Sequence, residues 1–131
     1  MEKTPAEFAV HVKQLEAALL TLDEVLMMEW SKVVRDAAIQ RFEYCFELVW
    51  KLIKRRLKLD GIEANSPRQA IRHAFETGYI EDVDFWFELL EDRNLTTHTY
   101  NAEIADKVFE SAKRLPDASR ALLLRMICEA K

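Results

Sequence analysis

The sequence predicts an all-α protein that forms one domain over residues 1–131. Half of its residues are apolar and about a third are charged, while it contains only two glycines and three prolines. This composition is typical of helical globular proteins and differs from that of disordered or β-rich chains. Apolar residues also recur at steps of three and four, which is the spacing of one helix face. A chain of this length can bury a core without disulfides or metal ions.

The first helix is expected from Pro5 to about Met28. Thr4-Pro5-Ala6-Glu7 has the pattern of a capping box with proline at the first helical position. A heptad-like apolar seam follows, made of Phe8, Val12, Leu15, Leu19, Leu22 and Leu26. Such a seam predicts packing within a helical bundle.

The second helix is expected to begin after Ser31 or Asp36, since either residue could cap it, and to end near Leu59. Gly61 follows and can adopt the left-handed conformation that ends many helices. The apolar face is wide and consists of Ala38, Ile39, Phe42, Cys45, Phe46, Val49, Leu52, Ile53 and Leu57. A face of this width predicts several neighbours, so we expect this helix at the centre of the bundle.

The final turns of the second helix are basic and carry Lys51, Lys54, Arg55, Arg56 and Lys58. Positive charge is favourable at the C-terminal end of a helix. Two interpretations remain open: a solvated helix face, or a patch that binds phosphate or a partner.

Two shorter helices are expected next. Ser66-Pro67-Arg68-Gln69 is a second capping box, which opens a short helix that ends near Gly78 and turns inward Ala70, Ile71, Ala74 and Phe75. The following helix is expected to begin at Glu81 or Asp82. Asp82-Val83-Asp84 could in principle hold magnesium, but it stands at a helix start without a Gly-Ser turn upstream, so capping is the preferred interpretation.

The last helix is expected to begin after Asn101, a natural N-cap. Its inward positions are Ile104, Val108, Phe109 and Ala112. Pro116 lacks a backbone N–H and is expected to break or kink the helix, with a final helical segment at residues 122–127. The two longest helices predict a bundle of antiparallel neighbours.

The segment 93–100 departs from this pattern. Arg93 ends an apolar stripe that begins at Val83, where a charge needs a partner. Asn94 and the three threonines that follow it are poor helix formers, so the helix is expected to end before His98. Residues five apart lie about 140° apart around a helix, so Arg93 and His98 can share a site only if the backbone leaves the regular helix.

The residues of this segment suit phosphodiester chemistry. Arg93 can bind a phosphate through two N–H groups, His98 can transfer a proton near neutral pH, and Tyr100 can donate a hydrogen bond or be modified. A purely structural role is the alternative: Arg93 would pair with Asp92 or Glu88, His98 would cap a helix, and Tyr100 would pack at the edge of the core.

The sequence contains neither a long apolar run nor an N-terminal signal pattern, so we expect a cytoplasmic protein without a membrane span. Cys45 and Cys128 show no metal-binding spacing and are expected to be free thiols. The formal net charge of -4 argues against broad attraction to nucleic acid, although it leaves room for a local phosphate pocket.

An ordered series of motifs runs along the chain: Ile39-Gln40-Arg41-Phe42-Glu43-Tyr44, Phe46-Glu47-Leu48 with Trp50-Lys51, Ser66-Pro67-Arg68, and Leu90-Glu91-Asp92-Arg93-Asn94-Leu95-Thr96 with His98-Thr99-Tyr100. Together they resemble the nucleotidyltransferase substrate-binding protein family of the HEPN superfamily. The resemblance covers about residues 8–115 and is weaker after Pro116. It implies an up-and-down four-helix bundle, with an additional short helix or a kinked C-terminal helix.

The resemblance also implies a homodimer that pairs with a separately encoded minimal nucleotidyltransferase, as a heterotetramer or in another stoichiometry. No intrinsic cofactor or metal is implied, and ATP and magnesium would act only with that partner. The Gly-Ser turn and spaced acidic pair of a nucleotidyltransferase are missing here. The residues expected to bind ligand or to be modified are Arg93, Asn94, Thr97, His98 and Tyr100.

Two functions remain open at this stage. The chain could be a non-catalytic subunit that presents substrate to the nucleotidyltransferase. In related toxins an Arg-x4-His-x-Tyr motif is associated with metal-independent RNase activity, which implies that Arg93 and His98 would be catalytic and that AMP on Tyr100 would silence the toxin. RNA would then be a partner. The acidic net charge favours the binding role.

A homodimer is also expected from the residues themselves. Trp86, Leu89, Leu90 and the wide face of the second helix offer more apolar surface than one four-helix core needs.

Overall fold

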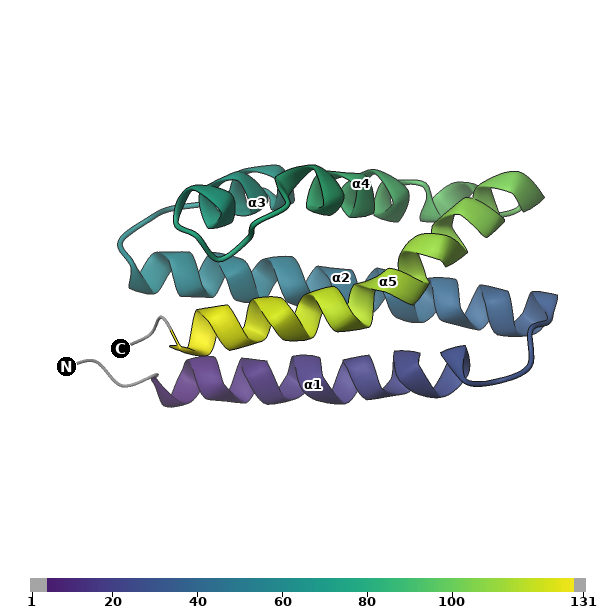
Figure 1. Ribbon diagram of the computed structural model, residues 1–131, viewed down its shortest axis with the longest axis horizontal. Helices are drawn as coiled ribbons and strands as arrows, with labels where there is room; N and C mark the ends of the chain where they lie inside the picture. The colour runs from purple at the N-terminus through teal and green to yellow at the C-terminus, as the bar shows by residue number, and fades with distance from the viewer. Residues whose placement is uncertain (1–4, 129–131) are drawn as a thin grey trace.

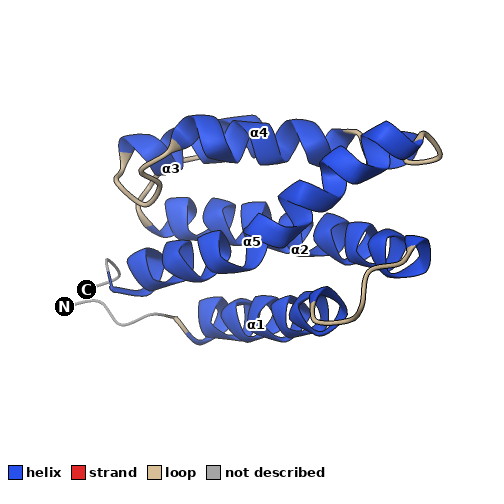
Figure 2. Ribbon diagram, turned by 45° about the vertical axis from the view of Figure 1, so that its right-hand side comes forward, coloured by secondary structure: helices blue, strands red, loops and turns tan. Residues whose placement is uncertain are grey.

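The computed structural model describes residues 5–128, apart from the side chain of Cys128. Within this part the chain is helical and contains no strand (Figure 2). The elements are α1 (Ala6–Leu26), α2 (Lys32–Leu59), α3 (Pro67–Glu76), α4 (Val83–Asn94), the 3-10 helix η1 (Thr96–His98) and α5 (Ala102–Cys128). The predicted all-α class is confirmed.

The helices form an up-and-down bundle (Figure 1). Helix α2 returns antiparallel to α1, α3 and α4 follow one another along α2, and α5 runs back across the bundle. The pair α3–α4 therefore occupies the third position of a four-helix bundle. Helix α2 contacts α1, α3, α4, α5 and η1, which confirms its predicted central place.

Helix α1 is slightly shorter than predicted. It begins at Ala6 with Pro5 at the N-cap position, so the proline precedes the first helical residue. Thr4, the predicted capping residue, lies outside the described residues. The seam is buried from Phe8 to Leu22 as expected, but the last turn buries Val25, and Leu26 is only partly buried.

Helix α2 has the predicted limits. The hydroxyl of Ser31 accepts a hydrogen bond from the Val34 N–H at 3.1 Å, so Ser31 is the cap, while Asp36 pairs with Arg35 at 3.2 Å. Gly61, with φ of 84°, ends the turn after the helix. All nine residues predicted for the apolar face are buried.

Helices α3 and α4 are capped where the sequence predicts. The Ser66 hydroxyl accepts from the Gln69 N–H at 3.2 Å, and the Asp82 carboxylate accepts from the Phe85 N–H at 3.0 Å. One inward assignment was wrong, because Phe75 is 45% exposed. The chain turns back after α3, where the N–H groups of Tyr79 and Ile80 donate to the Ala74 carbonyl, and both side chains are buried.

Helix α5 is continuous through Pro116. The side chain of Asn101 accepts hydrogen bonds from the N–H groups of Glu103 and Ile104 at 2.9 and 3.1 Å, which confirms the predicted cap. Figure 1 shows the helix bending between its green first half and its yellow second half. The proline therefore lies in a kinked helix, and the alternative of a break is excluded.

The apolar surface invoked for a dimer is used within one chain. Trp86, Leu89 and Leu90 are at most 5% exposed, and the Trp86 ring packs 6.5 Å from that of Phe46 on α2. The reason given for a dimer was therefore wrong, because α1, α3, α4 and α5 of the same chain all pack on α2. The homodimer itself stays a prediction.

Cys45 is a fully buried free thiol, as predicted, and burial raises its pKa to about 12. The side chain of Cys128 lies outside the described residues. Among the helices of residues 5–128, none combines the length and the apolar character that crossing a membrane requires.

Candidate functional site

Arg93 lies in the last turn of α4 and points to α2. Its guanidinium donates a hydrogen bond to the Glu47 carboxylate and a second one, at 3.3 Å, to the side chain of Asn94. The Arg93 side chain is 27% exposed. The arginine at the end of the apolar stripe is thus paired, as its position required, but with a residue of another helix.

The two partners proposed for Arg93 in the structural alternative bind elsewhere. Asp92 is 1% exposed and accepts hydrogen bonds from Lys107 and Ser111, both on α5. Glu88 lies 3.6 Å from Arg114. The local spacing of the sequence could not predict the contacts of Asp92 and Arg93, because their partners lie on α5 and α2.

Glu47 also binds a second cation. Its other carboxylate oxygen lies 3.3 Å from Lys51, one turn further along α2. Glu47 therefore binds both Arg93 and Lys51, and the three side chains together carry one net positive charge. Sequence reasoning missed Glu47 as a site residue, although it stands in one of the motifs that carry the family resemblance.

The backbone leaves the α-helix after Asn94, as predicted. The Thr96 hydroxyl donates to the Arg93 carbonyl at 2.9 Å, and the His98 N–H donates to the Leu95 carbonyl at 2.9 Å, which closes the 3-10 turn. Thr99 donates in the same way to the Thr96 carbonyl at 3.2 Å. The threonines thus stabilise a tight helical turn through their own side chains.

His98 and Tyr100 lie together on the outside of this turn. Their ring centroids are 6.1 Å apart at an interplanar angle of 72°. Tyr100 is 86% exposed, so the alternative that it packs at the edge of the core is wrong. Asn94 and Thr97 are exposed as well.

The turn therefore presents a phenol, an imidazole and polar side chains to solvent, with Arg93 held behind them. Within residues 5–128, no hydrogen bond links Arg93 to His98 or Tyr100. Their convergence in one cleft, expected from the sequence, stays a prediction. The same part of the chain contains no group of three or more histidine, cysteine, aspartate or glutamate side chains arranged to hold a metal ion.

The fold and this turn define a class of protein: a helical bundle with an Arg-x4-His-x-Tyr segment at the connection of its last two helices. Residues 10–127 match the family described as nucleotidyltransferase substrate binding protein like. The chain belongs to this family, which confirms the resemblance found in the sequence.

Two solved structures share the fold. A protein from Thermus thermophilus is 40% identical, with a TM-score of 0.80, and the match covers 86% of this chain and 98% of that protein. A Haemophilus influenzae protein, described as showing the fold of a substrate-binding domain of a nucleotidyltransferase, is 30% identical with a TM-score of 0.76 and coverage of 87% and 97%.

A curated relative carries a different name. A probable ribonuclease HepT from Haemophilus influenzae is 30% identical, and the match covers 76% of this chain and 80% of the relative. The names of the relatives thus include both functions that the sequence left open.

Proposed function

We propose that this chain is a non-catalytic substrate-binding subunit that works with a separately encoded minimal nucleotidyltransferase. Membership of the family and the 30% identical structural relative support this role. The sequence also lacks the Gly-Ser turn that precedes the acidic metal ligands of a nucleotidyltransferase, and its spaced acidic pair, Asp82 and Asp84, stands at the start of α4, where Asp82 caps the helix. The catalytic metal site would come from the partner.

The observation that carries the proposal is the exposure of Tyr100 beside His98. A phenol that is 86% exposed on a turn can enter the active site of another protein. In the reaction we propose, the Tyr100 oxygen attacks the α-phosphorus of ATP, the bond to pyrophosphate breaks, and the phenolic proton passes to His98 or to water. ATP and magnesium would be bound by the partner.

The pairing of Arg93 with Glu47 argues against Arg93 as a freely available catalytic cation. A guanidinium that already binds a carboxylate can orient a phosphate only by sharing or exchanging that partner. In addition, His98 is exposed and no described hydrogen bond fixes its ring, whereas proton transfer in catalysis needs a positioned imidazole.

A second candidate is a metal-independent RNase, the toxin of a toxin-antitoxin pair. The relative named as a probable ribonuclease favours it. Arg93 would stabilise the charge on the phosphorane, His98 would act as general acid or base, and a homodimer would supply both residues twice. AMP on Tyr100 would then switch the activity off.

The test combines the purified chain with its partner, magnesium and ATP labelled on the α-phosphate. We expect label on the wild-type chain only when the partner is present, and none on Tyr100→Phe. Tyr44→Phe is the matched control, because Tyr44 is 39% exposed and lies on α2 rather than on the turn. Labelling of the wild-type chain without the partner, or equal labelling of all three proteins, would contradict the proposal.

The RNase candidate is tested separately, by an RNA-cleavage assay. Arg93→Ala and His98→Ala should each lose about two orders of magnitude of RNA cleavage, the usual effect of removing a charge stabiliser or proton-transfer residue. His73→Ala serves as the control, since His73 lies on α3 and pairs with Glu76. A wild-type chain that cleaves no RNA would exclude this candidate.

A further inference from the structure

A row of lysines lies along the second half of α2, away from the turn that carries Tyr100. Lys51, Lys54 and Lys58 are spaced three and four residues apart, so they share one helix face, and all three are exposed. From Lys51 to Lys58 the row spans seven residue steps, which at a helical rise of about 1.5 Å per residue is about 10 Å. Within residues 5–128, Lys54 and Lys58 form no ion pair, and Lys51 reaches only Glu47.

Hollows border this row on both sides. One, of about 410 Å³, is lined by Lys54, Lys58 and residues 61–65 of the connection to α3. A second, of about 350 Å³, is lined by the three lysines together with Trp50 and Arg55. The two hollows have Lys54 and Lys58 in common in their linings, and together we call them the α2 groove.

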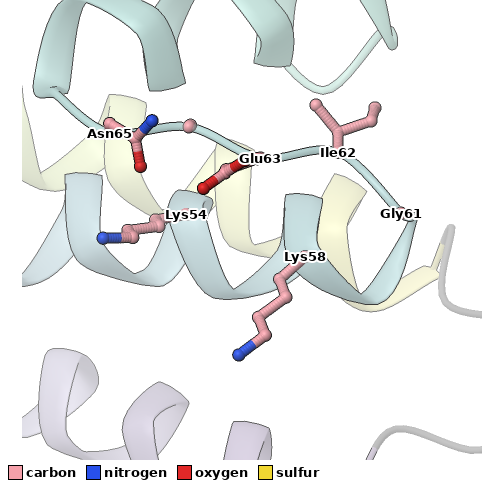
Figure 3. Close-up of a pocket in the computed structure, with 7 residues that line it drawn as sticks. Lys54, Lys58, Gly61, Ile62, Glu63 and Asn65 are labelled. Atoms are coloured by element: carbon pink, nitrogen blue, oxygen red, sulfur yellow. The ribbon is translucent and has the colours of Figure 1, made fainter.

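The two lysines that line both hollows extend from α2 in different directions. Figure 3 shows Lys54 extending beneath Glu63 and Asn65 of the connection, while Lys58 extends in a different direction. The ammonium group of Lys54 lies 6.0 Å from the centre of the Trp50 ring. The indole N–H of Trp50 is buried and has no hydrogen-bond partner among the described residues.

We propose that the α2 groove binds successive phosphates of a single-stranded oligonucleotide. Lys54 and Lys58 have no ion-pair partner among the described residues, and Lys51 extends the row. Ammonium groups in a row attract a chain of phosphates more strongly than one compact anion, because each added phosphate meets another cation. An aromatic ring beside the cations can contact a base once Lys54 moves from it onto a phosphate. Lys51, at one end of the row, shares the Glu47 carboxylate with Arg93.

The site goes beyond the proposed function, because it requires neither the partner nor the chemistry of Tyr100. Glu63 lies on the wall of the hollow and pairs with none of the three lysines, whereas Glu47 pairs with Lys51. The Glu63 carboxylate repels phosphate, so removing its charge should strengthen RNA binding, whereas removing lysine charges should weaken it.

The experiment measures fluorescence anisotropy of 5′-labelled single-stranded RNA of four and eight nucleotides, titrated with the full chain. With three phosphates engaged, the slope of log K against log salt should be about −2, which weakens binding about 15-fold between 50 and 200 mM salt. Lys54→Gln/Lys58→Gln should bind about tenfold more weakly with a shallower slope. Glu63→Gln should bind more tightly.

Lys13→Gln is the matched control, since it removes the same exposed charge from α1, outside the groove. It should bind as the wild type does. The titration contains neither the partner nor ATP, so its result does not depend on the proposed function. The groove is not an oligonucleotide site if the double variant Lys54→Gln/Lys58→Gln binds RNA as tightly as Lys13→Gln does. The same holds if unlabelled ATP displaces the labelled RNA as well as an unlabelled eight-nucleotide strand does.

Discussion

The guanidinium of Arg93 on α4 donates a hydrogen bond to the carboxylate of Glu47 on α2. The two residues are 46 positions apart in the sequence. The contact joins the end of α4 to the middle of the central helix, and it also decides whether the cation of the candidate site is available to a phosphate.

Glu47→Gln should therefore strengthen phosphate binding at the Arg93 site. The amide keeps a hydrogen-bond acceptor for Arg93 but removes the negative charge that competes with a ligand. Calorimetric titration with AMP should show tighter binding than for the wild type. Glu43→Gln, one turn earlier and exposed on α2, makes the same charge change and should have no effect. Weaker binding by Glu47→Gln would mean that Glu47 positions Arg93 for the ligand.

Asp92→Ala should destabilise the fold strongly. Asp92 is buried, and its loss leaves the Ser111 hydroxyl buried without its acceptor and frees Lys107. The expected loss is about 3 kcal/mol, at the lower end for breaking a buried charged contact because Lys107 stays half exposed. Urea unfolding measures it.

Glu110→Ala provides the comparison for Asp92→Ala. Glu110 lies on α5, the helix that carries the partners of Asp92, and pairs there with Lys113 at 3.0 Å on the exposed face. Such surface pairs contribute little, so this variant should unfold close to the wild-type midpoint. Similar midpoints for both variants would show that the Asp92 contacts are not important for stability.

The stability that Cys45 contributes should fall as the pH rises from 9 to 12. The unfolded thiol ionises above its ordinary pKa of 9.0, whereas the buried thiol keeps its proton up to a pKa of about 12. Ionisation then favours the unfolded state by about 1.4 kcal/mol per pH unit in this window. The difference in unfolding free energy between the wild type and Cys45→Ala should shrink accordingly. A difference that does not change with pH would contradict the burial effect.

The chain should sediment as a dimer at tens of micromolar. This prediction rests on the family resemblance alone, because the apolar residues first assigned to a dimer contact are buried within one chain. Analytical ultracentrifugation over a tenfold range of concentration would measure the association. A strictly monomeric species would also remove the model in which two protomers share one catalytic site.

The sequence was sufficient for those features that short segments determine by themselves. Ser66 and Asn101 cap the helices they were predicted to cap, and Ser31 and Asp82 are each one of the two candidates named for their helix, because a cap satisfies N–H groups only two or three residues away. The end of α4 before His98 was predictable for the same reason, since the threonines form their hydrogen bonds locally.

Features that depend on contacts between helices were not predictable. The helical spacing placed Trp86 on an apolar face but could not tell whether that face meets α2 of the same chain or a second protomer. Likewise, the sequence showed that Arg93 needs a partner, but Glu47 becomes its neighbour only when α4 packs on α2. The inward assignment of Phe75 failed because Tyr79 and Ile80 are buried instead.

The position of Asn101 has a consequence for the proposed modification of Tyr100. Asn101 caps α5, so Tyr100 stands immediately before the first turn of a 27-residue helix. The aligned peptide dipoles of that helix place a partial positive charge at its N-terminal end. A phosphate attached to the Tyr100 oxygen would add its negative charge near this end, where the helix dipole stabilises anions. The modified state of the turn would thus be favoured by the backbone of α5 itself, without any further basic side chain.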